Sequence, residues 1–355
     1  MEKHFAAKWI IRFFCVVLAI LTLLSTIAFI VDPFMQFRVK DNAYMLTGRY
    51  VSSGLIKNYD YDTLMIGSSM TQNFDMELFR QQLGAAPLHV NLGGINATEI
   101  ADLLNLAYDV QKADTYYIGI DILQFREGLT ENHFPKHLMK SDFLSMLRYL
   151  LSYEVWFGYL PVDIAFILLD KIGWDFPEKF VYQKSIDLLG DWRLDFPVWG
   201  EQIVIDHYLN QQYSVSKVDS ENLYQKNIAG IDAFFDRCDF TKGEHIFFFP
   251  PYSSLFWNEL YNRGQLDIYL QTKKYFIEKA MQHGVCIYDF QGADFTMDLD
   301  NYKDSTHYMP HINDWMVQCF VTGDYTITAD NMIQFQEKLQ ENTFQFREKY
   351  AELFN

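Results

Sequence analysis

The sequence has few cysteines and no excess of positive charge, and both shortages exclude classes of function. The four cysteines, Cys15, Cys238, Cys286 and Cys319, form no CxxC pair and no Cys/His cluster at zinc-like spacing. Neither a structural metal site nor a disulfide framework is therefore expected, although one disulfide would be compatible with the count. The formal net charge of −17 argues against nucleic acid as a partner, because phosphate backbones attract clustered lysine and arginine.

Low-complexity segments and internal repeats are also absent, and 50% of the 355 residues are apolar. A chain of this length and composition can bury a large core, in one domain or in two. We therefore expect a compact fold rather than disorder.

The longest uncharged run lies near the N-terminus, at 13–31 (FFCVVLAILTLLSTIAFIV), and is about long enough to span ~30 Å of hydrocarbon as a helix. It exceeds the apolar core of a typical signal peptide, and no small-residue cleavage site precedes DPFMQF, so we favour an uncleaved anchor over a cleaved signal. Lys3, Lys8 and Arg12 precede the run. The positive-inside rule therefore predicts a single-pass protein of the cell membrane, with a cytoplasmic N-terminus and everything after Asp32 outside.

Short apolar runs after residue 60 predict a parallel β-sheet. The runs are rich in β-branched and aromatic residues and end at Gly, Pro, Asn or Asp, as buried strands do. Helix-like segments separate them, and this alternation indicates right-handed crossovers and a sheet covered on both faces. In such sheets, active groups gather beyond the carboxyl ends of the strands. The predicted strands are 63–67, 88–93, 115–122, 245–250 and 285–290.

Composition suggests how the rest of the chain is organised. After the stub and anchor at 1–31, we expect a tether at 32–60, an α/β domain at 61–325 and an amphipathic helix at 326–355 that docks on that domain. A mainly helical insertion, rich in Trp, Tyr, Phe and Leu, is expected at about 126–240.

The insertion has more than one interpretation. It could be plain packing, a lid or a membrane-proximal acceptor surface. Its apolar run at 157–169 contains Pro161 and Asp163, and is too short for a comfortable second membrane span.

Three residues at predicted strand ends could form a nucleophile with its base. Serine attacks a carbonyl only after a base removes its proton, and that base works best when a third group orients it. Ser69 follows the first predicted strand, in IGSSMT, and Asp304 and His307 follow the last, in DSTH. Their spacing of three lets both side chains hydrogen-bond within one loop. Each motif alone is also common in ordinary turns and surface loops.

The pairing of IGSS after the first strand with DSTH before the last helix resembles the SGNH, or GDSL-like, hydrolase superfamily. NYDYDTLMIGSSMTQNF, FFFPPYSSLFW and DSTHY, with the N-terminal run and DPF, are similar to a group of membrane-anchored bacterial members. The resemblance covers about residues 30–325 and implies a three-layer α/β/α, flavodoxin-like parallel sheet. It also implies that Ser69 is the nucleophile, His307 its base and Asp304 the group that orients His307, with no cofactor and no metal.

The same resemblance implies an oxyanion hole made of the nucleophile's backbone N–H, a glycine N–H and an asparagine side chain. In NLGGINAT the glycine position falls on Gly94 or on Asn96, depending on the alignment. Asp121 stands where the asparagine would serve, and an ionised carboxylate cannot donate to an oxyanion; Asp121 could instead cap a strand end. Tyr252 lies on the presumed rim, as a wall of the acceptor site or as part of a rigid turn.

These observations predict a membrane-anchored, extracytoplasmic serine esterase or O-acyltransferase. Its substrate would be an acyl ester of a cell-envelope glycan or teichoic-acid-like polymer, and a membrane-bound acyl donor could be its partner. An anionic polymer would need a local basic patch or a bridging cation to offset the charge of the chain. The alternatives are a catalytically silent SGNH-like domain that binds a glycan or scaffolds a membrane partner, and a protein that docks through its C-terminal helix.

Overall fold

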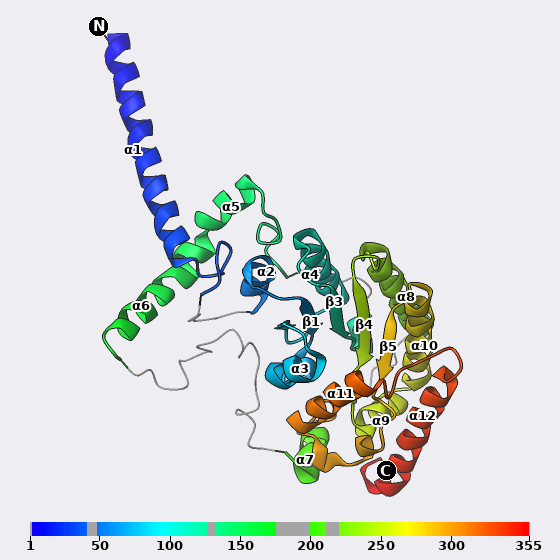
Figure 1. Ribbon diagram of the computed structural model, residues 1–355. Coiled ribbons are helices and arrows are strands. Elements are labelled where there is room, and N and C mark those ends of the chain that lie inside the picture. Colours follow the sequence, from blue (N-terminus) through cyan, green and yellow to red (C-terminus); the bar gives the residue numbers. More distant parts are fainter. Residues whose placement is uncertain (1, 41–47, 126–132, 175–198, 211–219, 355) are drawn as a thin grey trace. The chain divides into compact units, whose positions relative to one another are not determined.

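The computed structural model describes residues 2–40, 48–125, 133–174, 199–210 and 220–354, and the chain divides into two units (Figure 1). Unit 1 comprises Met1–Tyr59 and His133–Leu188, and unit 2 comprises Asp60–Asn132 and Leu189–Asn355. The expected insertion at 126–240 is therefore shared between the two units. Its parts at 126–132, 175–198 and 211–219 lie outside the described residues.

Unit 2 contains a five-stranded parallel sheet, as the apolar runs predicted (Figure 1). The strand order is β2-β1-β3-β4-β5, so the chain starts one strand in from the edge, adds β2 on one side of β1 and then adds β3, β4 and β5 in turn on the other side. β3 ends at Gly119, earlier than predicted, because Ile122–Phe125 forms a 3₁₀ turn instead of continuing the strand. The strands are β1 (Thr63–Gly67), β2 (Pro87–Asn91), β3 (Thr115–Gly119), β4 (Glu244–Phe249) and β5 (Cys286–Asp289).

Helices cover both faces of this sheet, because its central strands are apolar on both sides. Phe247 and Phe248 are adjacent in β4 and therefore point to opposite faces. Phe247 packs against Phe276, and Phe248 packs against Phe320. The helices on the Phe247 side are α4 (Ala97–Val110), α8 (Ser220–Arg237) and α10 (Leu266–Gln282), and those on the Phe248 side are α3 (Met76–Leu83) and α11 (Pro310–Thr322).

The C-terminal helix α12 (Met332–Lys349) packs against α9 (Ser254–Asn262) within unit 2. The Asn258 side chain donates to the Thr343 carbonyl oxygen at 2.8 Å, and the Asn342 side chain donates to the Gly292 carbonyl oxygen at 3.0 Å. Both amides are buried, so these bonds fix the docked position of α12. α7 (Glu201–Asn210) also belongs to this unit.

Unit 1 is helical in its described residues, and the expected tether contains one of its helices, α2 (Gly48–Asn58). α1 (Glu2–Val31) is long and apolar enough to cross a membrane over Ala6–Val31. The helical stretch Phe143–Lys171 is also long and apolar enough to cross a membrane. It is longer than the apolar run 157–169, which by itself is too short for a span. It consists of α5 (Phe143–Leu150), a π-helical turn (Glu154–Tyr159) and α6 (Leu160–Lys171).

His245 in β4 is a buried histidine whose hydrogen bonds fix it in the neutral form. Its Nδ1 donates to the Gly243 carbonyl oxygen at 3.1 Å, and its Nε2 accepts from the Tyr108 hydroxyl at 2.7 Å. The ring also stacks on Tyr116. Burial lowers the pKa of His245 to about 4. Protonation would remove the acceptor from Tyr108 and place an unpaired charge in the core.

Because the pKa of His245 is lowered in the folded state, protonation of the unfolded chain should reduce the free energy of unfolding in acid. An unfolded histidine binds a proton below a pH of about 6.5, so stability falls as the pH drops from there toward 4. His245→Gln keeps an acceptor for Tyr108 but does not titrate. The pH dependence of its unfolding free energy between pH 6 and 4.5, measured with urea in detergent, should be shallower by up to about 1.4 kcal/mol per pH unit. Equal slopes in the two proteins would contradict this account.

Candidate active site

Ser69 lies directly beyond the carboxyl end of β1. The strand ends at Gly67, and Ser69 begins the 3₁₀ turn Ser69–Thr71. Ser68 caps this turn with an extended backbone, and its Oγ accepts from the Met70 N–H at 3.2 Å. The cap ends the strand and leaves the Ser69 side chain half-buried at the edge of the sheet.

Thr71 folds back over two strand ends and requires glycine at both. A Cβ on Gly67 would lie 2.2 Å from Thr71 Cγ2, and a Cβ on Gly119 would lie 2.7 Å from the same methyl carbon. Thr71 itself is fixed, because its hydroxyl donates to the Ser68 carbonyl oxygen at 3.0 Å. The glycine that ends TLMIG therefore makes room for the residue that holds the Ser69 turn in place.

Asp304 organises the loop that precedes α11. Its Oδ1 accepts from the Thr306 N–H at 2.9 Å, the His307 N–H at 2.7 Å and the Thr306 hydroxyl at 3.1 Å. The imidazole of His307 turns toward the same carboxylate, with Nδ1 2.8 Å from Asp304 Oδ2. One side chain thus folds the loop and orients the histidine that the loop presents.

Ser69, His307 and Asp304, which the sequence predicts as a set, lie together in unit 2. The distance from Ser69 Oγ to His307 Nε2 is 2.9 Å. Because an ionised Asp304 can only accept a hydrogen bond, Nδ1 carries the proton and donates it to that bond, and Nε2 is left with its lone pair facing the Ser69 hydroxyl. Burial alone would raise the pKa of Asp304, but the hydrogen bonds from His307 and Thr306 and the charge of His307 bring that pKa well below its usual range. The carboxylate is therefore ionised at neutral pH.

Two residues that the sequence reasoning missed hold these loops together. Tyr308 is buried, and its hydroxyl donates to the Met70 carbonyl oxygen at 2.5 Å, which joins the His307 loop to the Ser69 turn. Ser253, after β4, donates its hydroxyl to the Ser305 carbonyl oxygen at 2.7 Å. The one available signal was Tyr308 in DSTHY, since a buried tyrosine normally needs a partner for its hydroxyl.

Asp121 follows β3 and is buried close to the proposed base. Its carboxylate accepts from the Tyr252 hydroxyl and also hydrogen-bonds with Ser68, the residue before Ser69. Burial raises the pKa of Asp121, against the lowering effects of those two hydrogen bonds and of the His307 charge. Tyr252 is only 2% exposed, so its contacts are with Asp121 rather than with solvent, and a role on a substrate rim stays a prediction.

Gly94 and Asn96 lie in the turn between β2 and α4 and differ in their surroundings. Asn96 caps α4: its side-chain oxygen accepts from the Glu99 N–H at 2.9 Å, and its own N–H donates to Glu99 Oε2 at 3.2 Å. Gly94 is exposed and has a φ of +63°, a conformation that suits glycine. The helix cap therefore already uses the Asn96 N–H.

No family model and no curated protein matches this chain. The arrangement has a definite chemical capacity all the same. The hydroxyl is hydrogen-bonded to an imidazole, and the imidazole is hydrogen-bonded to an ionised carboxylate. Such a hydroxyl can lose its proton to the imidazole as its oxygen attacks a carbonyl carbon.

The contact between Gly67 and Thr71 can be tested through stability. Gly67→Ala should lower the free energy of unfolding by about 1–3 kcal/mol, because the added methyl overlaps the Thr71 side chain. Thr71→Ala removes the two closest atoms, Cγ2 and Oγ1, and leaves only its Cβ at 2.9 Å, so the double variant should be more stable than the sum of the two single effects predicts. Urea unfolding of the four proteins measures this coupling. Strictly additive effects would show that Thr71 is not what demands glycine at position 67.

Proposed function

We propose that this protein is a serine esterase or O-acyltransferase built on the SGNH hydrolase fold. The observation that supports it most strongly is the hydrogen-bonded series from Ser69 Oγ to His307 Nε2, at 2.9 Å, and from His307 Nδ1 to Asp304 Oδ2, at 2.8 Å. The strand order β2-β1-β3-β4-β5 is that of a flavodoxin-like, doubly wound sheet, and Ser69 lies beyond the carboxyl end of β1, where such sheets bind ligands.

In the proposed reaction, His307 Nε2 takes the proton of Ser69 as Oγ attacks the carbonyl carbon of an acyl ester. Asp304 stabilises the imidazolium that forms. The ester C–O bond then breaks, and the leaving alcohol takes the proton from His307, so that the acyl group remains on Ser69. A water molecule or a sugar or alditol hydroxyl loses its proton to His307 and attacks the acyl carbon of this acyl-enzyme. The bond between that carbon and Ser69 Oγ then breaks as His307 returns the proton to Oγ, which completes hydrolysis or transfer and restores the free serine.

The oxyanion formed in each half-reaction requires hydrogen-bond donors. We assign the first to the Ser69 N–H, which lies in the first turn of a 3₁₀ helix and has no acceptor within that helix. For the second, Gly94 is favoured over Asn96, because the α4 cap uses the Asn96 N–H. Asp121 would supply the third only in its protonated form.

The proposed substrate class follows from the proposed location. α1 is apolar enough to cross a membrane, and Lys3, Lys8 and Arg12 precede its uncharged run. By the positive-inside rule the body of the protein would face the cell envelope. We therefore propose an acyl ester of an envelope glycan or teichoic-acid-like polymer as the substrate, with a membrane-bound acyl donor as the partner if the enzyme transfers.

A second candidate is a catalytically silent SGNH-like domain that binds glycan or scaffolds a membrane partner. Asp121 favours this candidate, because a catalytic site would have a neutral hydrogen-bond donor for the oxyanion at this position. The Asp121 carboxylate is instead buried and hydrogen-bonded to Ser68 and Tyr252. The two candidates predict opposite outcomes for removal of the Ser69 hydroxyl.

Turnover of a chromogenic acetyl ester by the full chain in detergent separates these candidates. Ser69→Ala should lower kcat/KM at least about 1000-fold, and adding His307→Ala should lower it little further, because the two groups act as a unit. Thr241→Ala, which removes an exposed hydroxyl bonded only to Asp239 on the surface, is the control and should keep wild-type activity. Full activity in Ser69→Ala would end the proposal.

Replacing Asp121 tests the oxyanion hole. Asp121→Asn supplies a permanent amide donor, so it should raise kcat by about tenfold or more at alkaline pH, where the wild-type carboxylate is ionised. Because burial raises the pKa of Asp121, the gain should shrink as the pH falls and the wild-type group regains its proton. Asp121→Ala is the control and should show no gain. A ratio of Asp121→Asn to wild-type kcat that does not change with pH, or an equal gain in Asp121→Ala, would place Asp121 outside the oxyanion hole.

A further inference from the structure

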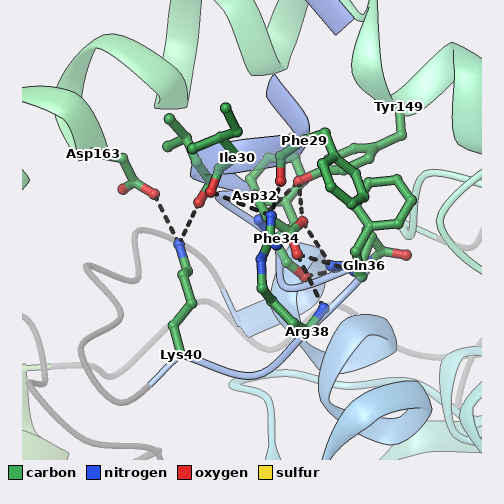
Figure 2. A network of polar contacts seen from close by, with 11 residues as sticks. Phe29, Ile30, Asp32, Phe34, Gln36, Arg38, Lys40, Tyr149 and Asp163 are labelled. Carbon is green, nitrogen blue, oxygen red and sulfur yellow. Dashed lines mark hydrogen bonds and ion pairs between the residues drawn. The ribbon is translucent and has the colours of Figure 1, made fainter. Parts of the chain in front are cut away.

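A buried network in unit 1 ties α5 and α6 to the point where α1 ends (Figure 2). Asp32 is fully buried, and its Oδ1 accepts from the Gln36 N–H at 2.9 Å and from the Tyr149 hydroxyl at 2.8 Å. Its Oδ2 accepts from the Phe37 N–H at 3.0 Å and the Arg38 N–H at 3.2 Å. The carboxylate thus turns the chain sharply after α1 and binds α5 through Tyr149.

Two basic side chains complete the junction by capping the carboxyl end of α1. Arg38 donates to the Phe29 carbonyl oxygen, and Lys40 Nζ donates to the Val31 carbonyl oxygen at 2.9 Å (Figure 2). The last carbonyl oxygens of a helix receive no hydrogen bond from within it, and a cation beside them is stabilised by the helix dipole. Lys40 also lies 3.4 Å from Asp163 Oδ2, which connects α6 to the same helix end.

This junction sets the depth of α5 and α6 relative to a spanning α1. Ala6–Val31 contains 26 residues and is about 39 Å long at 1.5 Å per residue, more than the ~30 Å of hydrocarbon. Ala28 and Val31, near its end, are buried, whereas most large side chains earlier in the helix are exposed. α5 and α6 therefore meet α1 at the membrane boundary.

Residues 143–174, the α5–α6 segment, expose an unusual amount of apolar surface. Phe143, Leu144 and Phe157 are each more than 70% exposed. Outside α1 and this segment, exposed large apolar side chains in the described residues are few and scattered over unit 2. The exposed set is Phe143, Leu144, Leu147, Tyr153, Phe157, Leu168, Ile172 and Trp174.

Charge in unit 1 is opposite in sign to that of the chain as a whole. Its described residues after α1, at 32–40, 48–59 and 133–174, contain eight lysines and arginines and five aspartates and glutamates, although the whole chain carries −17. Residues 143–174 themselves contain two basic and three acidic residues, so the positive charge flanks the segment, with Lys136 and Lys140 exposed just before α5. A basic flank beside exposed aromatic and aliphatic side chains is typical of a surface that enters the headgroup region of an anionic bilayer.

We propose that the α5–α6 segment is a second membrane contact that lies in the interface of an anionic bilayer, beside the exit of α1. The occupant of its apolar side chains is lipid, because α5 and α6 pack against the end of α1, where Phe29 and Ile30 are also exposed. The segment lies along the surface rather than across it, since Pro161 begins α6 and the buried Asp163 pairs with Lys40 at the helix end. This inference depends on α1 as a span and is independent of the chemistry of Ser69.

Depth-resolved quenching in the full chain tests the proposal. Single cysteines at Leu144, Phe157 and Leu168, in a background with the four native cysteines changed to serine, are labelled with an environment-sensitive fluorophore. Ile333→Cys in α12 is the matched control, because Ile333 is also apolar and 63% exposed but belongs to unit 2. The proteins are reconstituted into vesicles of phosphatidylcholine with phosphatidylglycerol, with spin-labelled lipids that carry the quencher at a shallow or a deep position.

The proposal requires at least twofold quenching of the three α5–α6 labels by the shallow lipid, weaker quenching by the deep lipid and none at position 333. It also requires quenching to increase with the phosphatidylglycerol fraction. Stronger quenching by the deep lipid would show a second span and overturn the proposal. Absence of quenching, or fluorescence that depends on the protein-to-lipid ratio because a second copy covers the face, would overturn it as well.

Discussion

The Asp304 carboxylate is the group on which the geometry of the candidate site depends. It accepts hydrogen bonds from the Thr306 and His307 backbone and from the Thr306 hydroxyl, and it binds His307 Nδ1. These bonds keep it ionised, and an ionised Asp304 leaves Nε2 as the acceptor for Ser69. One half-buried charge therefore folds the loop, selects the tautomer and orients the imidazole.

The parallel sheet brings this loop to a serine that is 238 residues distant in the sequence. Parallel strands end at one edge, so the turn after β1 and the connection at 290–309, between β5 and α11, both lie beyond the same strand ends. That connection contains two short 3₁₀ turns and reaches from the outermost strand, β5, to the end of β1. Packing then fixes the meeting at atomic scale. Thr71 holds the Ser69 turn over two glycines, and Tyr308 ties that turn to the His307 loop.

The strands and the Ser69, Asp304 and His307 set were within reach of the sequence, since buried strands are short apolar runs and their carboxyl ends share an edge. Tyr308, Thr71 and Ser253 were not, because each acts through a contact with a residue that local patterns do not pair with it. The division of the insertion between two units was equally hidden. It depends on Tyr149 and Asp163 reaching the end of α1, and no periodicity predicts those bonds.

The claim that Ser69 is an activated nucleophile is tested most directly by covalent labelling of the folded protein with a fluorophosphonate, with the adduct located by peptide mass spectrometry. A fluorophosphonate reacts with serines whose hydroxyl is deprotonated by a neighbouring base. The account predicts a stoichiometric adduct on Ser69 that is lost in His307→Ala. A folded protein that forms no adduct, or one that is labelled equally well without His307, would contradict it.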